Sequence, residues 1–403
     1  MRMINNFYFK QILIIAGSNP AFFVLSWMPI LRLSDGNTSI PYRIGLIGIA
    51  LWAVLYVIRK YHKTRTLVFF AVIMLIPILI LITILLYSNQ SGSGAIQAII
   101  EFLIFAVPAG LYGTIFALEK RNMRLQSCII GVGILYTISS LIVIVSNAPF
   151  FEIYGSNYQQ LAYISATALI YFGYVYMNYD RESNFFILRN KRVSKTICIL
   201  GMLLNSFFVI RSNGRGGAVL AGLFIIYFLV YSKNKKEKIL LISAFLVVFV
   251  FNFSKIITRI VNTRIYQTIL VFFTNPSLAL DGEVRGRLYR EGISAFIENP
   301  ILGNGVGSVW YKIGFYSHNF FVDLLCEMGL TGLFIFMLLA FWMKQKIRLN
   351  NDKEAVFVNL ILLISLVEGL FSGYYLQCLG LWFAIGYYMS IGNVNNMKRE
   401  AHI

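Results

Sequence analysis

The chain has 403 residues, of which 58% are apolar and only 13% are charged. The apolar residues gather in repeated blocks long enough to cross roughly 30 Å of hydrocarbon, which indicates a polytopic membrane protein of all-α class and excludes an ordinary soluble protein. The formal charge of +18 would suit a nucleic-acid binder, but the Lys and Arg residues stand in short clusters between apolar blocks. Such clusters mark membrane topology, so no nucleic-acid partner is expected.

Twelve apolar blocks of about 16 to 25 residues predict twelve transmembrane helices in a single membrane domain that covers residues 1–403. The expected spans are 12–31, 42–58, 67–87, 95–118, 128–146, 159–179, 196–211, 216–231, 239–254, 318–342, 355–372 and 374–391. The first block is too long and too weakly terminated for a cleaved signal peptide, and we interpret it as the first span.

Basic residues cluster in alternate loops, and the positive-inside rule places those loops and both termini in the cytoplasm. The clusters lie at 59–65, 120–124, 189–195, 233–238 and 344–353. The opposite loops are short and nearly uncharged, apart from the turn 211–215 and the polar segment 253–317 between the ninth and tenth spans. We expect this segment to be one large loop on the outer face, where most of any chemistry takes place.

The four cysteines are scattered singly within apolar blocks. They are Cys128, Cys198, Cys326 and Cys378. This pattern contains neither a disulfide framework nor the spacing of metal ligands, so we interpret the cysteines as packing residues.

The turn 211–217, with the sequence RSNGRGG, joins two expected spans on the outer face. Its glycines let the backbone come close to a ligand, and Arg211 and Arg215 flank the turn. One interpretation is a tight turn whose arginines reach lipid headgroups. The other is an anion site, because a planar guanidinium donates two parallel hydrogen bonds to phosphate oxygens.

Residues 284–298 show a helical period and predict an amphipathic helix that ends before Asn299-Pro300. The expected apolar face holds Tyr289, Ile293, Phe296 and Ile297, and the expected polar face holds Arg287, Glu291, Ser294 and Glu298. The helix is either an interfacial anchor or a surface that presents arginines to phosphates held by the turn 211–217.

Alternating glycines follow this helix at Gly303, Gly305 and Gly307. They either form a backbone nest for an anion or simply turn the chain back toward the membrane. No strand, loop and helix pattern supports a dinucleotide or P-loop site.

The segment 317–319, with the sequence SHN, stands where the outer loop re-enters the membrane. His318 is the only histidine expected outside the cytoplasmic face, and imidazole titrates near about pH 6.5, so it can accept a proton from a hydroxyl. A purely structural histidine is the alternative. Four acids lie within expected spans and are further candidates: Asp323, Glu327, Glu101 and Glu368.

Taken together, these residues resemble the O-antigen polymerase and O-antigen ligase superfamily of lipid-linked oligosaccharide glycosyltransferases. The resemblance rests on the strings 214–217 and 296–307, on Arg287, on 317–319 and on 327–332. Polymerases of the superfamily have been described with arginine and glycine at fixed separations in two outer loops, and Arg211 with Gly222 and Arg287 with Gly303 have similar spacing. Tyr289-Arg290 stands where members often carry tryptophan.

The resemblance implies a GT-C-like membrane glycosyltransferase that needs no metal or other cofactor. It would act on undecaprenyl-diphosphate-linked oligosaccharide at the periplasmic face of the bacterial inner membrane. Arg215 and Arg287, helped by Arg211 and Arg290, would bind the diphosphate and stabilise the charge that develops as it leaves. His318 would accept or orient the proton of the attacking sugar hydroxyl.

Several alternatives remain open at this point. Asp323 and Glu327 are second choices for the base. A polymerase transfers the growing glycan to a new lipid-linked repeat unit, whereas a ligase transfers the finished chain to lipid A core. We favour the polymerase, because the amino-acid composition of this chain resembles that of polysaccharide-cluster polymerases. Membrane lipids are expected partners, and a chain-length regulator and a flippase are possible ones. A secondary transporter with intramembrane acids is the competing class.

Overall fold

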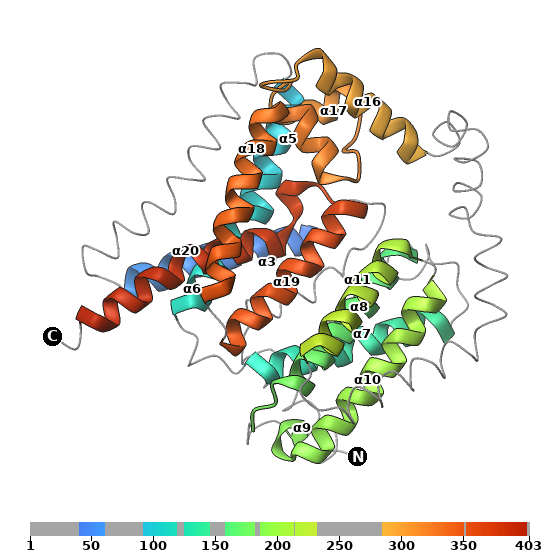
Figure 1. Ribbon diagram of the computed structural model, residues 1–403, viewed down its shortest axis with the longest axis vertical. Helices are drawn as coiled ribbons and strands as arrows, with labels where there is room; N and C mark the ends of the chain where they lie inside the picture. The colour runs from blue at the N-terminus through green and yellow to red at the C-terminus, as the bar shows by residue number, and fades with distance from the viewer. Residues whose placement is uncertain are drawn as a thin grey trace.

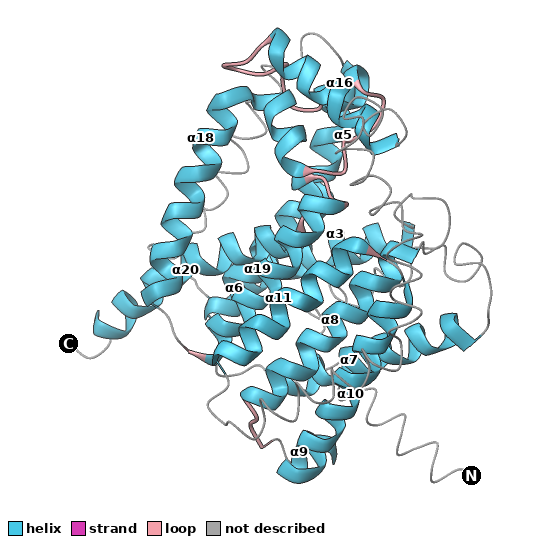
Figure 2. Cartoon of the chain, turned by 45° about the vertical axis from the view of Figure 1, so that its right-hand side comes forward, coloured by secondary structure: helices cyan, strands magenta, loops and turns pink. Residues whose placement is uncertain are grey.

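The computed structural model describes residues 40–60, 92–118, 125–145, 158–181, 186–212, 214–231, 284–349 and 352–400. Every regular element in these ranges is helical and none is a strand (Figure 2). Five helical segments are long and apolar enough to cross a membrane, as expected for a polytopic membrane protein. The expected spans 12–31, 67–87 and 239–254 lie outside the described residues, so the number twelve and the GT-C-like architecture stay predictions.

The described helices follow most of the expected spans closely. They are α3 (Ile40–Lys60), α5 (Gly92–Glu101), the π-helical turn η3 (Phe102–Ala106), α6 (Val107–Leu118), α7 (Leu125–Val145), α8 (Tyr158–Met177), α9 (Phe186–Arg189), α10 (Lys191–Ser212), α11 (Arg215–Tyr231), α16 (Val284–Glu298), α17 (Ser308–Lys312), α18 (Phe320–Leu349), α19 (Lys353–Phe371), the 3₁₀ turn η4 (Tyr375–Gln377) and α20 (Leu379–Glu400). Two expected spans differ: 374–391 begins only at Leu379, after η4, and 318–342 continues to Leu349 and is broken at Gly329.

Helix α8 is the centre of one bundle, and α7, α10 and α11 pack around it (Figure 1). Nearly all of its residues between Leu161 and Tyr176 are buried. A glycine on α8 makes room for an aromatic ring of a neighbouring helix. An added Cβ on Gly173 would overlap Cζ of Phe224. A helix that carries this many tyrosines and hydroxyl groups is therefore covered by protein and not by lipid.

A second bundle is built on the contact of α6 with α20, and α3 and α19 pack against it (Figure 1). The two backbones meet at glycines: a Cβ on Gly113 would overlap the carbonyl of Phe383, and one on Gly386 would overlap the carbonyl of Gly110. Small residues at such a contact allow the close approach that drives helix association in membranes.

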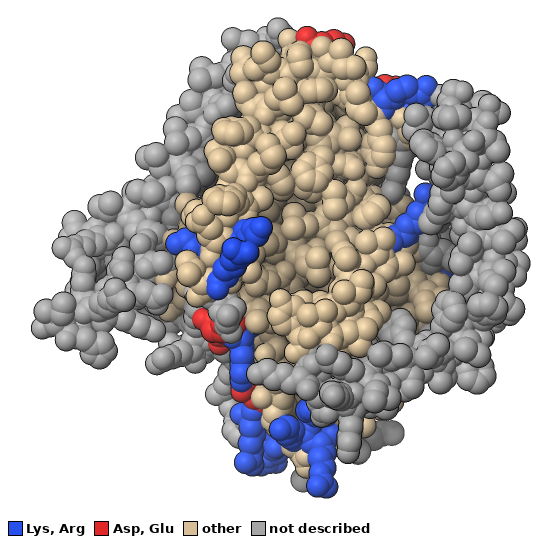
Figure 3. All heavy atoms as spheres, in the orientation of Figure 1, with Lys and Arg blue, Asp and Glu red and all other residues tan. Residues whose placement is uncertain are grey.

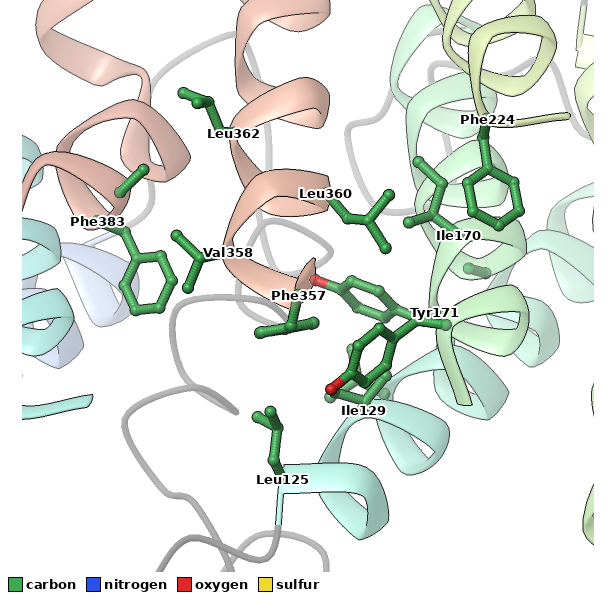
Figure 4. Close-up of a cluster of buried hydrophobic side chains, with 14 of the residues drawn as sticks. Leu125, Ile129, Ile170, Tyr171, Phe224, Phe357, Val358, Leu360, Leu362 and Phe383 are labelled. Carbon is green, nitrogen blue, oxygen red and sulfur yellow. The ribbon is translucent and has the colours of Figure 1, made fainter. Parts of the chain in front are cut away.

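Helix α19 joins the two bundles, because it contacts both α20 and α11. The ring of Phe357 lies between them, with its centroid 5.2 Å from that of Tyr174, 6.2 Å from that of Tyr171 and 6.3 Å from that of Phe116 (Figure 4). One continuous apolar core results.

A smaller core lies at the other end of the molecule, where α5, α16 and α17 meet the first half of α18 (Figure 1). Its buried side chains include Leu288, Ala295, Val309, Ile313, Cys326 and Tyr374. The described part of the expected outer loop is thus folded onto the helices. The remainder of the loop, 253–283, lies outside the described residues.

The predicted amphipathic helix is confirmed as α16, with the bounds expected from the sequence, but its apolar face is not the face that packs most closely against the protein. Leu288, Gly292 and Ala295 face the protein, whereas Ile293 and Ile297 are 47% and 68% exposed. The reason is steric, because Gly292 lets α16 approach α18 so closely that an added Cβ would lie 2.6 Å from Val322 Cγ1. A hydrophobic pattern does not register such small contact residues.

The exposed isoleucines belong to an apolar stripe that continues onto α18. The stripe consists of Ile293, Ile297, Ile301, Leu302 and Leu330. Hydrogen bonds from the amides of Leu330 and Thr331 to the carbonyls of Pro300 and Ile301 hold its two parts together. Beyond Leu330, α18 exposes large apolar side chains such as Phe334 and Phe341, as a lipid-facing helix does. We therefore expect the stripe to contact acyl chains.

This expectation is testable with nitroxide labels, because the cysteines in the described residues are all buried. A label at Ile297→Cys in proteoliposomes should be more accessible to oxygen than to a water-soluble nickel reagent. A label at Glu291→Cys, about 120° away around the helix by the 3.6-residue period, should show the opposite preference. Equal accessibility at the two positions would contradict lipid contact.

Candidate active site

The segment 317–319 forms the cap of α18. The side-chain oxygen of Asn319 accepts hydrogen bonds from the amides of Phe321, at 3.0 Å, and Val322, at 3.4 Å. The amide of Ser317 donates to Oδ1 of the buried Asp323 at 2.7 Å, and the Ser317 hydroxyl donates to the carbonyl of Asn319. Caps of this kind satisfy amides that have no partner within the helix.

His318 lies between these capping bonds with φ of 63°, the only positive φ outside glycine among the described residues. A left-handed residue with a Cβ costs roughly 1–2 kcal/mol, so the bonds of Ser317 and Asn319 must hold it there. The conformation turns the imidazole toward the end of α19, where Nδ1 lies 3.4 Å from the carbonyl oxygen of Ser372. A carbonyl only accepts, so Nδ1 is the donor in this contact, and in the neutral imidazole the lone pair then lies on Nε2.

Glu327 is 1% exposed and its carboxylate is held by tyrosines. The hydroxyl of Tyr374 donates to it at 3.0 and 3.1 Å, and the hydroxyl of Tyr375 donates at 2.6 Å. A neighbouring buried acid, Glu101, accepts from Gln97 at 2.6 Å and from Gln377 at 2.9 Å. These acids tie α5, α18 and η4 together, while Glu368 is exposed near the end of α19.

The glycines at 303–307 serve close packing. At the break in α18, the carbonyls of Cys326 and Glu327 accept hydrogen bonds from the amides of Asn304 and Gly305, both at 2.9 Å. Gly329 has φ of 60° and a non-helical backbone, and an added Cβ there would lie 2.6 Å from the carbonyl of Ile301. The loop and the broken helix thus satisfy each other's backbone groups, which supports the interpretation of 303–307 as a turn.

Two glycines of this region provide a matched test. Gly303 and Gly314 have φ of 74° and 82°, but a Cβ on Gly303 would overlap the Glu327 carbonyl, whereas one on Gly314 would meet nothing within 4 Å. We expect Gly314→Ala to cost about 1 kcal/mol through its φ alone and Gly303→Ala to cost several times more, as a lower thermal midpoint in detergent. Equal midpoints would contradict the interlocked loop.

A side chain of α8 connects the turn 211–217 with the region around His318. Position 213 lies outside the described residues, and Arg211 and Arg215 are exposed at the end of α10 and the start of α11. A Cβ on Gly216 would overlap the hydroxyl of Tyr163, which lies 3.4 Å from Oγ of Ser372. Since Ser372 is also the partner of His318, the structure brings the turn 211–217 and the segment 317–319 together.

Arg287 and Arg290 are both exposed on α16. Arg287 Nε lies 3.6 Å from Glu291 Oε1, one helical turn away. Basic side chains over α16 and over the adjoining ends of α10 and α11 lie on the same side of the molecule (Figure 3). A hydrogen bond from Lys312 to Glu298 fixes the far end of α16 to α17 and raises the pKa of Lys312.

The sequence analysis did not identify Tyr163, Ser372 or Gln159 as residues near His318. The side chain of Gln159 accepts a 3.4 Å hydrogen bond from the Ser372 hydroxyl. Polar residues at the ends of expected spans were a usable signal, because such groups are costly in lipid unless they find partners. Within the described ranges, no cluster of three or more His, Cys, Asp or Glu residues could hold a metal ion. The roles expected for the arginines, His318, Asp323 and Glu327 stay predictions.

Comparison with known proteins gives one finding. No curated protein matches the chain at a significant level. The family model described as O-antigen ligase matches residues 200–337, which is about a third of the chain and contains the turn 211–217, α16, the glycine loop and the segment 317–319. This match confirms that residues 200–337 resemble the O-antigen polymerase and ligase superfamily.

Proposed function

We propose that this membrane protein is an O-antigen polymerase. It transfers a growing glycan from undecaprenyl diphosphate to a sugar hydroxyl of a new undecaprenyl-diphosphate-linked repeat unit at the periplasmic face. The observation that carries the proposal is the meeting of the turn 211–217 with His318, through Tyr163 and Ser372, inside the segment that matches the O-antigen ligase family.

The proposed step breaks the bond between the anomeric carbon and the diphosphate oxygen and forms a bond from that carbon to the acceptor oxygen. The acceptor proton passes to Nε2 of His318, which the Nδ1–H bond to Ser372 keeps as the acceptor. The leaving diphosphate gains negative charge, and Arg215 and Arg287 stabilise it, with Arg211 and Arg290 beside them. These fixed guanidiniums supply positive charge without a cofactor.

Asp323 and Glu327 have supporting roles in this proposal. Asp323 holds the amide of Ser317, next to His318. Glu327 is enclosed by the hydroxyls of Tyr374 and Tyr375 and ties α18 to the segment that contains them. The Glu327 carboxylate is poorly placed to accept a proton from a sugar, because two buried hydroxyls already engage it.

An O-antigen ligase is the second candidate, because the matching family is described by that activity. Donor and leaving group are the same, and the acceptor becomes lipid A core. The same arginines and His318 serve both reactions, so the acceptor has to be determined by experiment. A chain-length regulator and a flippase are the partners we propose for the polymerase.

The test uses purified protein in nanodiscs with undecaprenyl-diphosphate-linked repeat unit as sole substrate, with and without EDTA. A ladder of lengthening glycans under both conditions is expected. Product that forms only after lipid A core is added would assign the ligase, and loss of the ladder with EDTA would contradict the cofactor-free step. No transfer to either acceptor would overturn the proposed function.

A further inference from the structure

We propose that Phe315, backed by Tyr316 and Trp310, is a platform on which a sugar ring of the acceptor stacks beside His318. The inference rests on the proposed function and deepens it, because it names a binding subsite for the uncharged glycan. The arginines are suited to bind the diphosphate. Another part of the site has to position the acceptor sugar whose hydroxyl reacts.

The exposure of the aromatic residues near His318 singles out Phe315. Phe320 is 2% exposed, and Tyr374 is fully buried with its hydroxyl donating to Glu327. Tyr311 donates its hydroxyl to the carbonyl of Asn304 at 3.4 Å. Phe315 is 41% exposed, so it offers a ring face to a ligand, and the half-buried Tyr316 lies directly next to it.

The rings of Phe315 and Tyr316 are stacked, with centroids 4.2 Å apart and an interplanar angle of 30°. Trp310 meets both rings edge-on, at 5.4 Å from Phe315 and 5.7 Å from Tyr316. Tyr316 also stacks on the buried Tyr374 at 6.0 Å. The exposed ring is therefore fixed from behind, and a ligand that stacks on it loses little side-chain freedom of the protein.

The platform adjoins the proposed base. The His318 ring centroid lies 5.4 Å from that of Phe315 and 4.7 Å from that of Tyr316. A pyranose that lies against the exposed face of Phe315 is thus a close neighbour of the imidazole, and a hydroxyl on its rim can reach Nε2. Gly314 has φ of 82°, so the chain turns sharply just before the platform.

The chemistry of the pair is suitable. A sugar ring has an apolar face of C–H groups and a polar rim, and an aromatic face attracts such weakly positive groups while the rim stays available for hydrogen bonds. An aromatic contact of this kind is expected to change affinity roughly threefold to tenfold. An exposed phenylalanine in a membrane protein can also contact lipid. The experiment distinguishes contact of Phe315 with a sugar from contact with lipid.

The experiment separates the sugar from the diphosphate. The repeat-unit oligosaccharide is released from its lipid by mild acid and added to the full-length protein in nanodiscs, and binding is followed by saturation-transfer NMR. Wild type and Phe315→Tyr should saturate the C–H protons of one sugar with similar dissociation constants. Phe315→Ala should bind roughly threefold to tenfold more weakly and lose that transfer.

Phe341→Ala is the matched control, since Phe341 is 61% exposed at the far end of α18. It should bind the oligosaccharide as wild type does, and thermal midpoints of all variants should agree. Unchanged binding by Phe315→Ala would overturn the platform and favour lipid contact, whatever the transfer assay gives. Binding that depends on Phe315 in a protein that transfers no glycan would support the platform and overturn the proposed function instead.

Discussion

Replacing His318 by alanine is expected to lower the rate of glycan transfer by about 10²–10⁴, the range for a positioned general base. Nδ1 of the imidazole is engaged by the Ser372 carbonyl, and the backbone at φ 63° is fixed by its neighbours, so the ring has one defined orientation. The measurement is the single-turnover rate with saturating lipid-linked substrate, which reports the chemical step without binding or product release.

Alanine at 318 also changes the backbone, because it tolerates a positive φ poorly. His318→Asn is the control, since asparagine adopts the left-handed region readily but cannot act as a base. Both variants should show this loss of rate, and His318→Asn should keep the wild-type thermal midpoint. A His318→Asn enzyme with near wild-type rate would show that the histidine serves only the turn.

Asp323→Asn tests the same assignment from the other side. The amide of asparagine can still accept the hydrogen bond from Ser317, so the cap of α18 should persist. We expect its single-turnover rate to stay within about tenfold of wild type, far above that of His318→Ala. A loss as large as that of His318→Ala would move the role of base to Asp323.

The sequence predicted the helices of the described residues well, because membrane spans carry a strong apolar signal. The bounds of α16 also followed from its period and from Pro300. The buried face of α16 could not be predicted in the same way, because Gly292 and Ala295 make the contact through their small size and add little to a hydrophobic pattern. The break at Gly329 depends on partners that are distant in the sequence, because the amides of Leu330 and Thr331 donate to the carbonyls of Pro300 and Ile301. No local sequence pattern contains these contacts.

The candidate site was predictable to the same extent. Arg215, Arg287 and His318 stood out as polar residues in an apolar chain, and the family match contains all three. Tyr163 and Ser372 were not distinguished, because each looks like an ordinary residue of a span end. Their importance is a property of the packing of α8, α11 and α19, which places them between Gly216 and His318.

The arginines should produce the other large effect. Arg215→Ala and Arg287→Ala are each expected to lower kcat/KM by about 10²–10³, because each removes a fixed positive charge from the leaving diphosphate. Lysine should restore only part of the loss, since it cannot donate two parallel hydrogen bonds. Arg348→Ala, at the opposite end of α18 and also exposed, should leave kcat/KM unchanged. Glu291→Ala should also be tolerated, because it only releases Arg287 from its ion pair.

The double variant Arg215→Ala/Arg287→Ala decides whether the two side chains act on one ligand. They come from different helices, α11 and α16, and basic side chains over both helices lie on the same side of the molecule (Figure 3). Residues that bind the same group lose less together than the sum of their separate losses, whereas independent residues are additive. We therefore expect kcat/KM of the double variant to be at most roughly tenfold lower than that of the less active single variant. Strict additivity would contradict a common diphosphate site and would assign Arg287 to another part of the substrate.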